Sequence, residues 1–182
     1  MKGGVITALA LTVAAMAVAQ VPQAPMPLYY VPSAPARIEG MLREIPRPDG
    51  PSLDTSIKLA LAAVESCKAK GGKVSVLVTD SMGIPIVLLS GDGAGERSQL
   101  ITQTKAHIVV KYRMPSGDVA KKARADPQLA KELALNPNIG IARDGGVPLM
   151  LGGELIGALA VSGLTGQDEI CAREALAKVP LH

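Results

Sequence analysis

The chain of 182 residues contains no Trp, no Phe and only three Tyr, and this aromatic deficit constrains its fold more than any other feature. Tyr29 and Tyr30 precede the part of the sequence with globular patterning, so Tyr112 stands alone within that part. A hydrophobic fraction of 48% and a charged fraction of 19% are typical of a globular chain, so we expect a core of Ala, Val, Leu, Ile and Met. The deficit disfavours binding of single-stranded nucleic acid, which stacks bases on aromatic rings, and it disfavours aromatic cages.

The formal net charge of +3 gives no indication of a nucleic-acid-binding surface. The densest basic cluster, Lys121, Lys122 and Arg124, is flanked by Asp118 and Asp126. Interspersed charges of both signs are typical of a solvated helix face. We therefore expect no nucleic-acid partner.

Residues 1–19 carry the pattern of a secretory signal peptide, in which Lys2 precedes an apolar run that ends in Ala17-Val18-Ala19. The run from Val5 to Ala19 is shorter than the roughly 20 residues of a membrane-spanning helix. We expect export to the periplasm or the medium, with no membrane span after removal of the leader.

Residues 20–51 are rich in Pro and predict an extended linker or arm, because Pro fixes φ and removes backbone donors. The domain is expected at residues 52–182. Export would place Cys67 and Cys171 in an oxidising compartment, where a disulfide could form. Two buried thiols on separate helices are the alternative.

The patterning of residues 52–182 predicts an α+β fold with an antiparallel sheet covered by helices. Alternating or continuous apolar runs predict two hairpins, one over residues 74–89 and one over residues 147–162, and a short strand over 139–142. Ser52 is expected to cap a helix that ends near Gly71. The helical spacing of four apolar residues predicts its buried stripe: Leu53, Ile57, Leu61 and Val64.

A glycine-rich loop at residues 91–95 leads into a helix that is expected to reach Tyr112. Asp92 lies in this loop, and Ser98 is expected to cap the helix, so the Ser98 hydroxyl and nearby N–H groups could hold a carboxylate. Lys105 shares a helix face with Tyr112, whereas His107 lies on a different side. Taken alone, Lys105 is expected to be a surface lysine and His107 a surface or packed residue. Membership of a binding site is the alternative for both.

Other motifs are incomplete. The loop has Glu96 where a dinucleotide-binding loop needs Gly, and His182 is the last residue, so a histidine-based metal site would depend on His107 alone. Asp168 and Glu169 stand at an expected helix start, where the helix dipole favours carboxylates. General acid–base chemistry is the alternative for this pair.

An ordered set of segments between residues 53 and 179 resembles the GlcG/HbpS-like haem-binding family. The segments are residues 74–83, 91–95, 145–148 and 157–163, Lys105-Ala106, Asp168-Glu169 and Cys171-Ala172. The resemblance implies a profilin-like fold of α/β/α layers with a five-stranded antiparallel sheet. It also implies self-assembly and, for some members, haem binding.

Related loops often carry a His that this chain lacks, because residues 93–98 read Gly-Ala-Gly-Glu-Arg-Ser. Haem iron accepts His, Met, Tyr or Cys, so His107 is the expected iron ligand, and Tyr112, Met114, Met82 and Met150 are further donors. Lys105 and Arg97 could pair with haem propionates. The expected ligand-binding residues are Asp92, Gly93, Arg97, Ser98, Lys105, His107, Tyr112 and Met114.

We therefore expect an exported, oligomeric protein that binds haem or another tetrapyrrole, in haem or iron handling or redox sensing, and is not itself a strong catalyst. One alternative is an enzyme on a small carbonyl or hydroxy-acid substrate, with Lys105 as base or anion clamp and Asp92 as its partner. A lowered pKa of Lys105 in a closed pocket would favour this alternative. Another is a structural oligomer without a ligand.

Overall fold

The computed structural model describes residues 49–181. The expected signal peptide (1–19) and most of the expected arm (20–51) lie outside the described residues. In chain order the elements are α1 (Leu53–Lys68), β1 (Ser75–Asp80), β2 (Pro85–Ser90), α2 (Ser98–Tyr112), α3 (Ser116–Ala125), α4 (Pro127–Leu135), β3 (Gly146–Leu151), β4 (Glu154–Ser162) and α5 (Asp168–Lys178). Within residues 49–181, no helix is both long and apolar enough to cross a membrane.

The sheet has the strand order β2-β1-β4-β3, and every pairing in it is antiparallel. Both predicted hairpins form, as β1–β2 and β3–β4, so the α+β class is confirmed. Pro85 begins the edge strand β2 and pairs with Thr79, next to a register shift in β1. Proline has no backbone N–H to donate, so it is tolerated at such an edge position.

The described part of the sheet has four strands, so the expectation of a fifth is wrong. Residues 139–142 form no strand, because the backbone N–H groups of Ile139 and Gly140 both donate to the Asn136 carbonyl at the end of α4. The Ile139 side chain packs in a small cluster with Ile108, Val119 and Leu133. The apolar run at residues 139–142, which predicts a strand, is therefore explained by the packing of Ile139 in this cluster.

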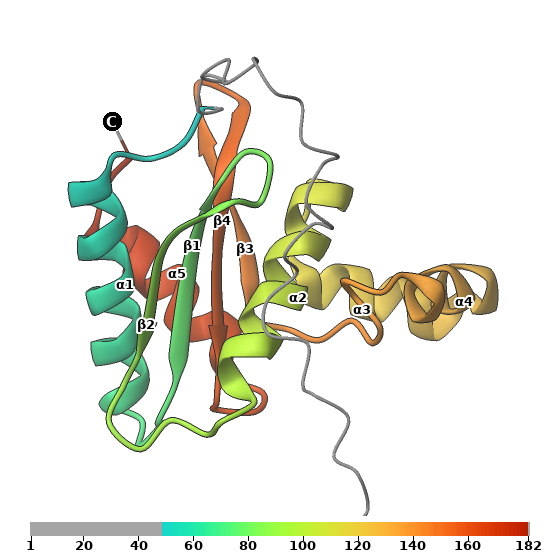
Figure 1. Ribbon diagram of the computed structural model, residues 1–182, viewed down its shortest axis with the longest axis horizontal. Coiled ribbons are helices and arrows are strands. Elements are labelled where there is room, and N and C mark those ends of the chain that lie inside the picture. Colours follow the sequence, from blue (N-terminus) through green and yellow to red (C-terminus); the bar gives the residue numbers. More distant parts are fainter. Residues whose placement is uncertain (1–48, 182) are drawn as a thin grey trace, which may run out of the picture. The chain divides into compact units, whose positions relative to one another are not determined.

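Helices cover both faces of the sheet (Figure 1). On one face, α1 and α5 pack over a core of mainly aliphatic side chains from β1 and β4, such as Val76, Val78 and Val161. On the other face, Ala106 of α2 packs against Ala158 and Ala160 of β4. These small side chains let the helix approach the strands closely, which explains how a core without aromatic rings is filled.

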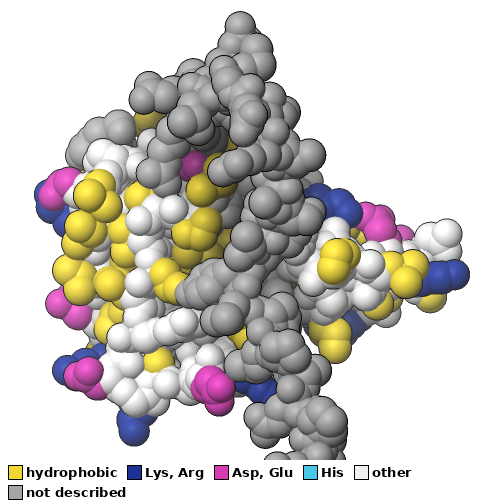
Figure 2. All heavy atoms as spheres, viewed as in Figure 1, with side chains coloured by type: hydrophobic (Ala, Val, Ile, Leu, Met, Phe, Trp, Pro, Cys, Tyr) yellow, Lys and Arg dark blue, Asp and Glu magenta, His cyan; other side chains and the backbone are white. Residues whose placement is uncertain are grey.

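Helix α1 begins as predicted, since the Ser52 hydroxyl accepts a hydrogen bond from Thr55 N at 3.1 Å. Its predicted buried stripe is wrong at three of four positions: Leu53, Ile57 and Leu61 are 60%, 40% and 50% exposed, whereas Val64 packs against the core. The helix instead buries a face of smaller residues: Ser56, Leu59, Ala60, Ala63 and Cys67. Figure 2 shows hydrophobic side chains gathered over α1 and β2.

Helices α1 and α5 are joined by a disulfide between Cys67 and Cys171, with 5.4 Å between the two Cα atoms. Both cysteines are fully buried, and their neighbours Ala63, Ala172 and Ala175 are small. Small side chains at this contact allow the two helices to come within disulfide distance. Of the two alternatives for these cysteines, the structure shows the disulfide.

Candidate functional site

The described domain contains a buried ion pair between Lys105 of α2 and Asp168 of α5. Lys105 Nζ donates to Asp168 Oδ2 at 2.8 Å and to the carbonyl oxygen of Val161 at 2.7 Å. The two residues are only 2% and 4% exposed. Lys105 is therefore not the surface lysine expected from the sequence, and its acidic partner is Asp168, not Asp92.

Several backbone features hold this pair in place. Asp168 accepts a second hydrogen bond, from Leu164 N to its Oδ1 at 2.8 Å, which orients the carboxylate at the start of α5. Gly145 has a φ of +115°, and a Cβ atom there would lie 2.7 Å from Lys105 Nζ. Since L side chains rarely adopt such a φ, Gly145 supplies both the backbone conformation and the space that the lysine needs.

Burial changes the acid–base properties of the site. Burial lowers the pKa of Lys105 from its ordinary value, because water no longer solvates the ammonium group. The negative charge of Asp168 and its hydrogen bond to Lys105 act in the opposite direction, since they favour the charged form. The balance is an amine that gives up its proton more easily than an exposed lysine.

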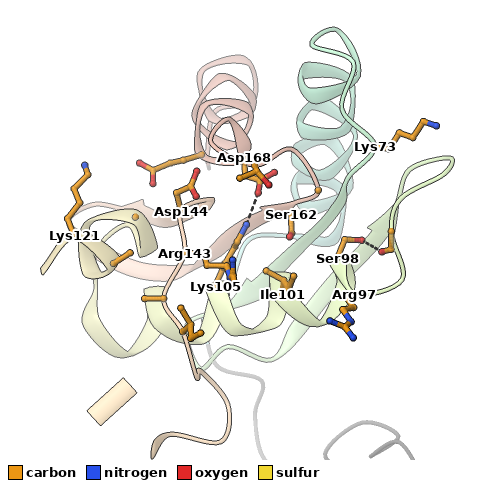
Figure 3. Close-up of a pocket in the computed structure, with 18 of the residues that line it drawn as sticks. Lys73, Arg97, Ser98, Ile101, Lys105, Lys121, Arg143, Asp144, Ser162 and Asp168 are labelled. Atoms are coloured by element: carbon orange, nitrogen blue, oxygen red, sulfur yellow. Dashed lines mark hydrogen bonds and ion pairs between the residues drawn. The ribbon is translucent and has the colours of Figure 1, made fainter. Parts of the chain in front are cut away.

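The pair lies at the wall of a cavity of about 720 Å³, within the range of small-ligand sites. Figure 3 shows Lys105 extending from α2 toward Asp168, with Ser162 at the end of β4 beside them. Helix α3 and the segment before β3 supply a further side of the cavity, which includes Gly117, Ala120 and residues 141–144.

The lining of the cavity is predominantly basic, with six Lys or Arg and three Asp or Glu. The basic residues are Lys73, Arg97, Lys105, Lys121, Arg124 and Arg143. Within residues 49–181, no carboxylate forms an ion pair with Lys73, Arg97, Arg124 or Arg143. These cations are available to an anionic ligand.

The structure brings only some of the predicted site residues together. Arg97, Ser98 and Lys105 line the cavity, whereas Asp92 and Gly93 are exposed and do not line it. Ser98 is the first residue of α2 rather than its cap, and its hydroxyl bonds to the Ser75 hydroxyl at 2.6 Å and to the Gly95 carbonyl. Ser98 therefore ties the glycine-rich loop to β1.

The predicted iron donors lie elsewhere in the domain. His107 faces the β1–β2 turn at Gly83, where burial lowers the pKa of its imidazole. The Tyr112 hydroxyl donates to Glu132 of α4 at 3.0 Å, and Tyr112 and Met114 both pack against the cluster that contains Ile108. None of these three residues lines the cavity.

Several polar residues of the site are not predicted there from the sequence, among them Ser162, Arg143, Asp144 and Asp168. Asp168 was explained by its position at a helix start, and that position does hold, but its buried contact with Lys105 spans 63 residues. Two sequence signals point to this site: the acid–base alternative for Asp168 and Glu169, and the Gly145-Gly146 pair, because glycines often mark a close approach of the backbone.

The fit of a haem to this cavity can be tested against its lining. The unpaired cations suit the carboxylates of a tetrapyrrole, and Ile101, Ile141 and Ala142 supply apolar surface. The lining residues include no His, Met, Tyr or Cys, so the described part of this chain offers no common ligand for iron at the cavity. The cavity therefore fits the periphery of a haem and not its metal. No group of three or more His, Cys, Asp or Glu in the described range could hold a metal ion.

The fold and the site together define an α+β domain with a basic cavity of small-ligand size beside a buried Lys–Asp pair. Residues 52–177 match the family model described as haem degrading protein HbpS-like. The chain belongs to this family.

Solved structures agree with this assignment. A double mutant of HbpS from Streptomyces reticuli is 31% identical, with a TM-score of 0.65, and the match covers 80% of this chain and 98% of that one. A PduOC–haem complex is 26% identical, with a TM-score of 0.65 and coverage of 73% and 97%. The Klebsiella pneumoniae protein ORFY, at 22% identity, a TM-score of 0.66 and coverage of 75% and 95%, shares the fold. Among curated proteins, none matches the chain.

Proposed function

We propose that this protein binds haem or another tetrapyrrole in the basic cavity and holds it through its carboxylates. The observation that carries the proposal is the set of unpaired cations, Arg97 and Arg143 among them, around a cavity with an apolar wall. Membership of the HbpS-like family and similarity to a PduOC–haem complex support a tetrapyrrole over other anions. The role would lie in haem or iron handling or in redox sensing.

A titration with two porphyrins tests this proposal. The cavity offers cations for the carboxylates of the porphyrin but, among the described residues, no common ligand for its iron. Haemin and metal-free protoporphyrin IX should therefore bind with dissociation constants within about a factor of three of each other. Arg97→Ala and Arg143→Ala should each weaken both ligands about two- to fivefold, as for exposed charge pairs. Absorbance and fluorescence quenching report the binding.

Two sets of control variants separate this site from the other candidates. Lys111→Ala removes a basic residue that pairs with Glu132 outside the cavity, and binding should not change. His107→Ala, Tyr112→Ala and Met114→Ala should also leave both affinities unchanged. Haemin binding that is lost in His107→Ala and retained in Arg97→Ala would place the ligand at His107 and overturn the proposal.

We infer also that the protein is exported and assembles with copies of itself. Export is supported by the signal-peptide pattern of residues 1–19 and by the disulfide, which suits an oxidising compartment. Self-assembly is supported by the exposed line of Leu53, Ile57 and Leu61 on α1, next to the edge strand β2, which has no charged residue. An uncharged edge strand beside an apolar face is normally covered, and a two-fold axis would pair the edge with itself.

Mutation of the α1 face tests self-assembly. Ile57→Glu with Leu61→Glu should convert the oligomer to a monomer, because two carboxylates would be buried at the interface. Light scattering after size exclusion measures the mass, and circular dichroism checks the fold. Leu135→Glu is a matched control, since Leu135 is 74% exposed on α4, away from this face. An unchanged mass in the double variant would contradict the proposed interface and favour another surface, such as the Gly-rich β3–β4 hairpin.

The burial of Lys105 beside Asp168 favours a second candidate function, in which the cavity acts on a small carbonyl or hydroxy-acid substrate. Lys105 would serve as base or anion clamp, with Asp168 as its acidic partner. A structural oligomer without a ligand is the remaining candidate, and it is favoured if both porphyrins and small carboxylates fail to bind.

A further inference from the structure

The Lys105 amine has the surroundings of a nucleophile as well as those of an ion pair. Two of its bonding directions are used by Val161 O and Asp168 Oδ2. In the ammonium form the remaining position is a third N–H, and in the neutral amine it is a lone pair. Lys105, Asp168 and Ser162 all line the cavity, so a small molecule there can meet this amine.

A polar group next to the amine is also unused. Ser162 is 4% exposed, lies on the cavity wall, and its hydroxyl is hydrogen-bonded to none of the described residues. A buried hydroxyl normally has a partner, so one that faces a cavity is suited to a ligand oxygen. Arg97 and Arg143, which form no ion pair with the described residues, also line the cavity.

We propose that Lys105 forms a reversible imine with a small carbonyl compound that carries a carboxylate. The proposal deepens the second candidate function and uses the same cavity as tetrapyrrole binding, but it does not depend on that binding. The Arg side chains would attract the carboxylate, and the Ser162 hydroxyl would donate to the carbonyl oxygen. Desolvated lysines beside a proton acceptor are used for such chemistry in other proteins.

The step balances with the groups that are present. Lys105 passes one proton from its ammonium group to Asp168, and rotation about the Cε–Nζ bond turns the resulting lone pair toward the cavity. The lone pair attacks the carbonyl carbon, so that a C–N bond forms. A second nitrogen proton moves to the oxygen, and Asp168 returns the first proton to the same oxygen, which leaves as water when the C–O bond breaks. The product is a protonated imine that still faces the Asp168 carboxylate, so the buried site keeps one positive and one negative charge.

Burial assists this reaction. An ordinary lysine is almost fully protonated at neutral pH, and each unit by which the pKa is lowered raises the free-amine fraction about tenfold. Burial lowers the pKa of Lys105, whereas Lys131 on α4 is exposed. Lys105 should therefore react with a carbonyl compound faster than Lys131 of the same protein.

Reductive trapping on the full exported chain tests the proposal. The protein is incubated with glyoxylate and sodium cyanoborohydride, which reduces an imine to a stable secondary amine, and the modified lysines are mapped by peptide mass spectrometry. We expect Lys105 to be the most heavily labelled lysine, with a labelling rate that saturates as glyoxylate increases. Propanal, which lacks the carboxylate, should label lysines without saturation and without preference for Lys105.

Variants sharpen the result. Lys105→Arg should abolish the saturable label, and the matched control Lys131→Arg should not affect it. The labelling map of the protein without substitutions remains a valid test even if Lys105→Arg fails to fold. Labelling spread over exposed lysines, with Lys105 unlabelled, would overturn the proposal. Saturable labelling of Lys105 in a protein that binds neither porphyrin would support the imine and reject tetrapyrrole binding. Porphyrin binding without labelling of Lys105 would support tetrapyrrole binding and reject the imine.

Discussion

Asp168→Ala should lower the free energy of unfolding by about 3–5 kcal/mol, the usual cost of leaving one member of a buried ion pair alone. Lys105 is 2% exposed, and without Asp168 its ammonium group would keep only the Val161 carbonyl as a partner. The variant would also leave Leu164 N without its acceptor, which adds to the loss. Chemical denaturation followed by circular dichroism measures the change.

A double variant separates the charge from the packing. Lys105→Met with Asp168→Leu replaces the pair by apolar side chains and should recover most of the lost stability, because no unpaired charge remains buried. The exposed pair of Asp54 and Lys58 is the matched control, and Asp54→Ala should cost less than about 1 kcal/mol. If Asp168→Ala also lowers the free energy of unfolding by less than about 1 kcal/mol, the buried pair contributes no more to stability than a surface pair.

Loss of the disulfide should cost about 2–5 kcal/mol, since Cys67 and Cys171 are separated by 104 residues and the bond restricts a long loop of the unfolded chain. The double variant Cys67→Ala with Cys171→Ala should therefore unfold at a lower denaturant concentration. Dithiothreitol should produce a similar shift in the parent protein.

The same double variant is the control for the reductant, because dithiothreitol should not change its stability. Two free thiols in the unreduced parent protein, counted after unfolding, would contradict the disulfide. The bond joins α1, whose outer face is proposed to mediate assembly, to α5, which begins with Asp168. Its loss is therefore also expected to weaken the ligand site.

The local features of the fold were predictable from the sequence because they depend on neighbouring residues. The Ser52 cap, the two hairpins and the break after α1 follow from short-range rules of capping, alternation and glycine conformation. The aromatic deficit also predicted correctly that the core would be aliphatic, and the contact of Ala106 with Ala158 and Ala160 shows how such a core is filled.

The orientation of α1 was not predictable in this way. Helical spacing identified Leu53, Ile57 and Leu61 as one face, but not which face of α1 would contact the sheet. The smaller face was buried because α1 packs against the sheet and is also joined to α5. Periodicity alone identifies the faces of a helix and not which face packs into the core.

The candidate site combines features that the sequence predicts with contacts that form only in the folded domain. The sequence by itself determined the α+β class, the family resemblance and the presence of Lys105 on a helix after the glycine-rich loop. Only the tertiary structure paired Lys105 with Asp168, 63 residues away, and placed His107, Tyr112 and Met114 away from the cavity. Local patterns describe contacts along the chain, whereas burial and charge pairing arise between segments that meet only when the sheet and its helices have assembled.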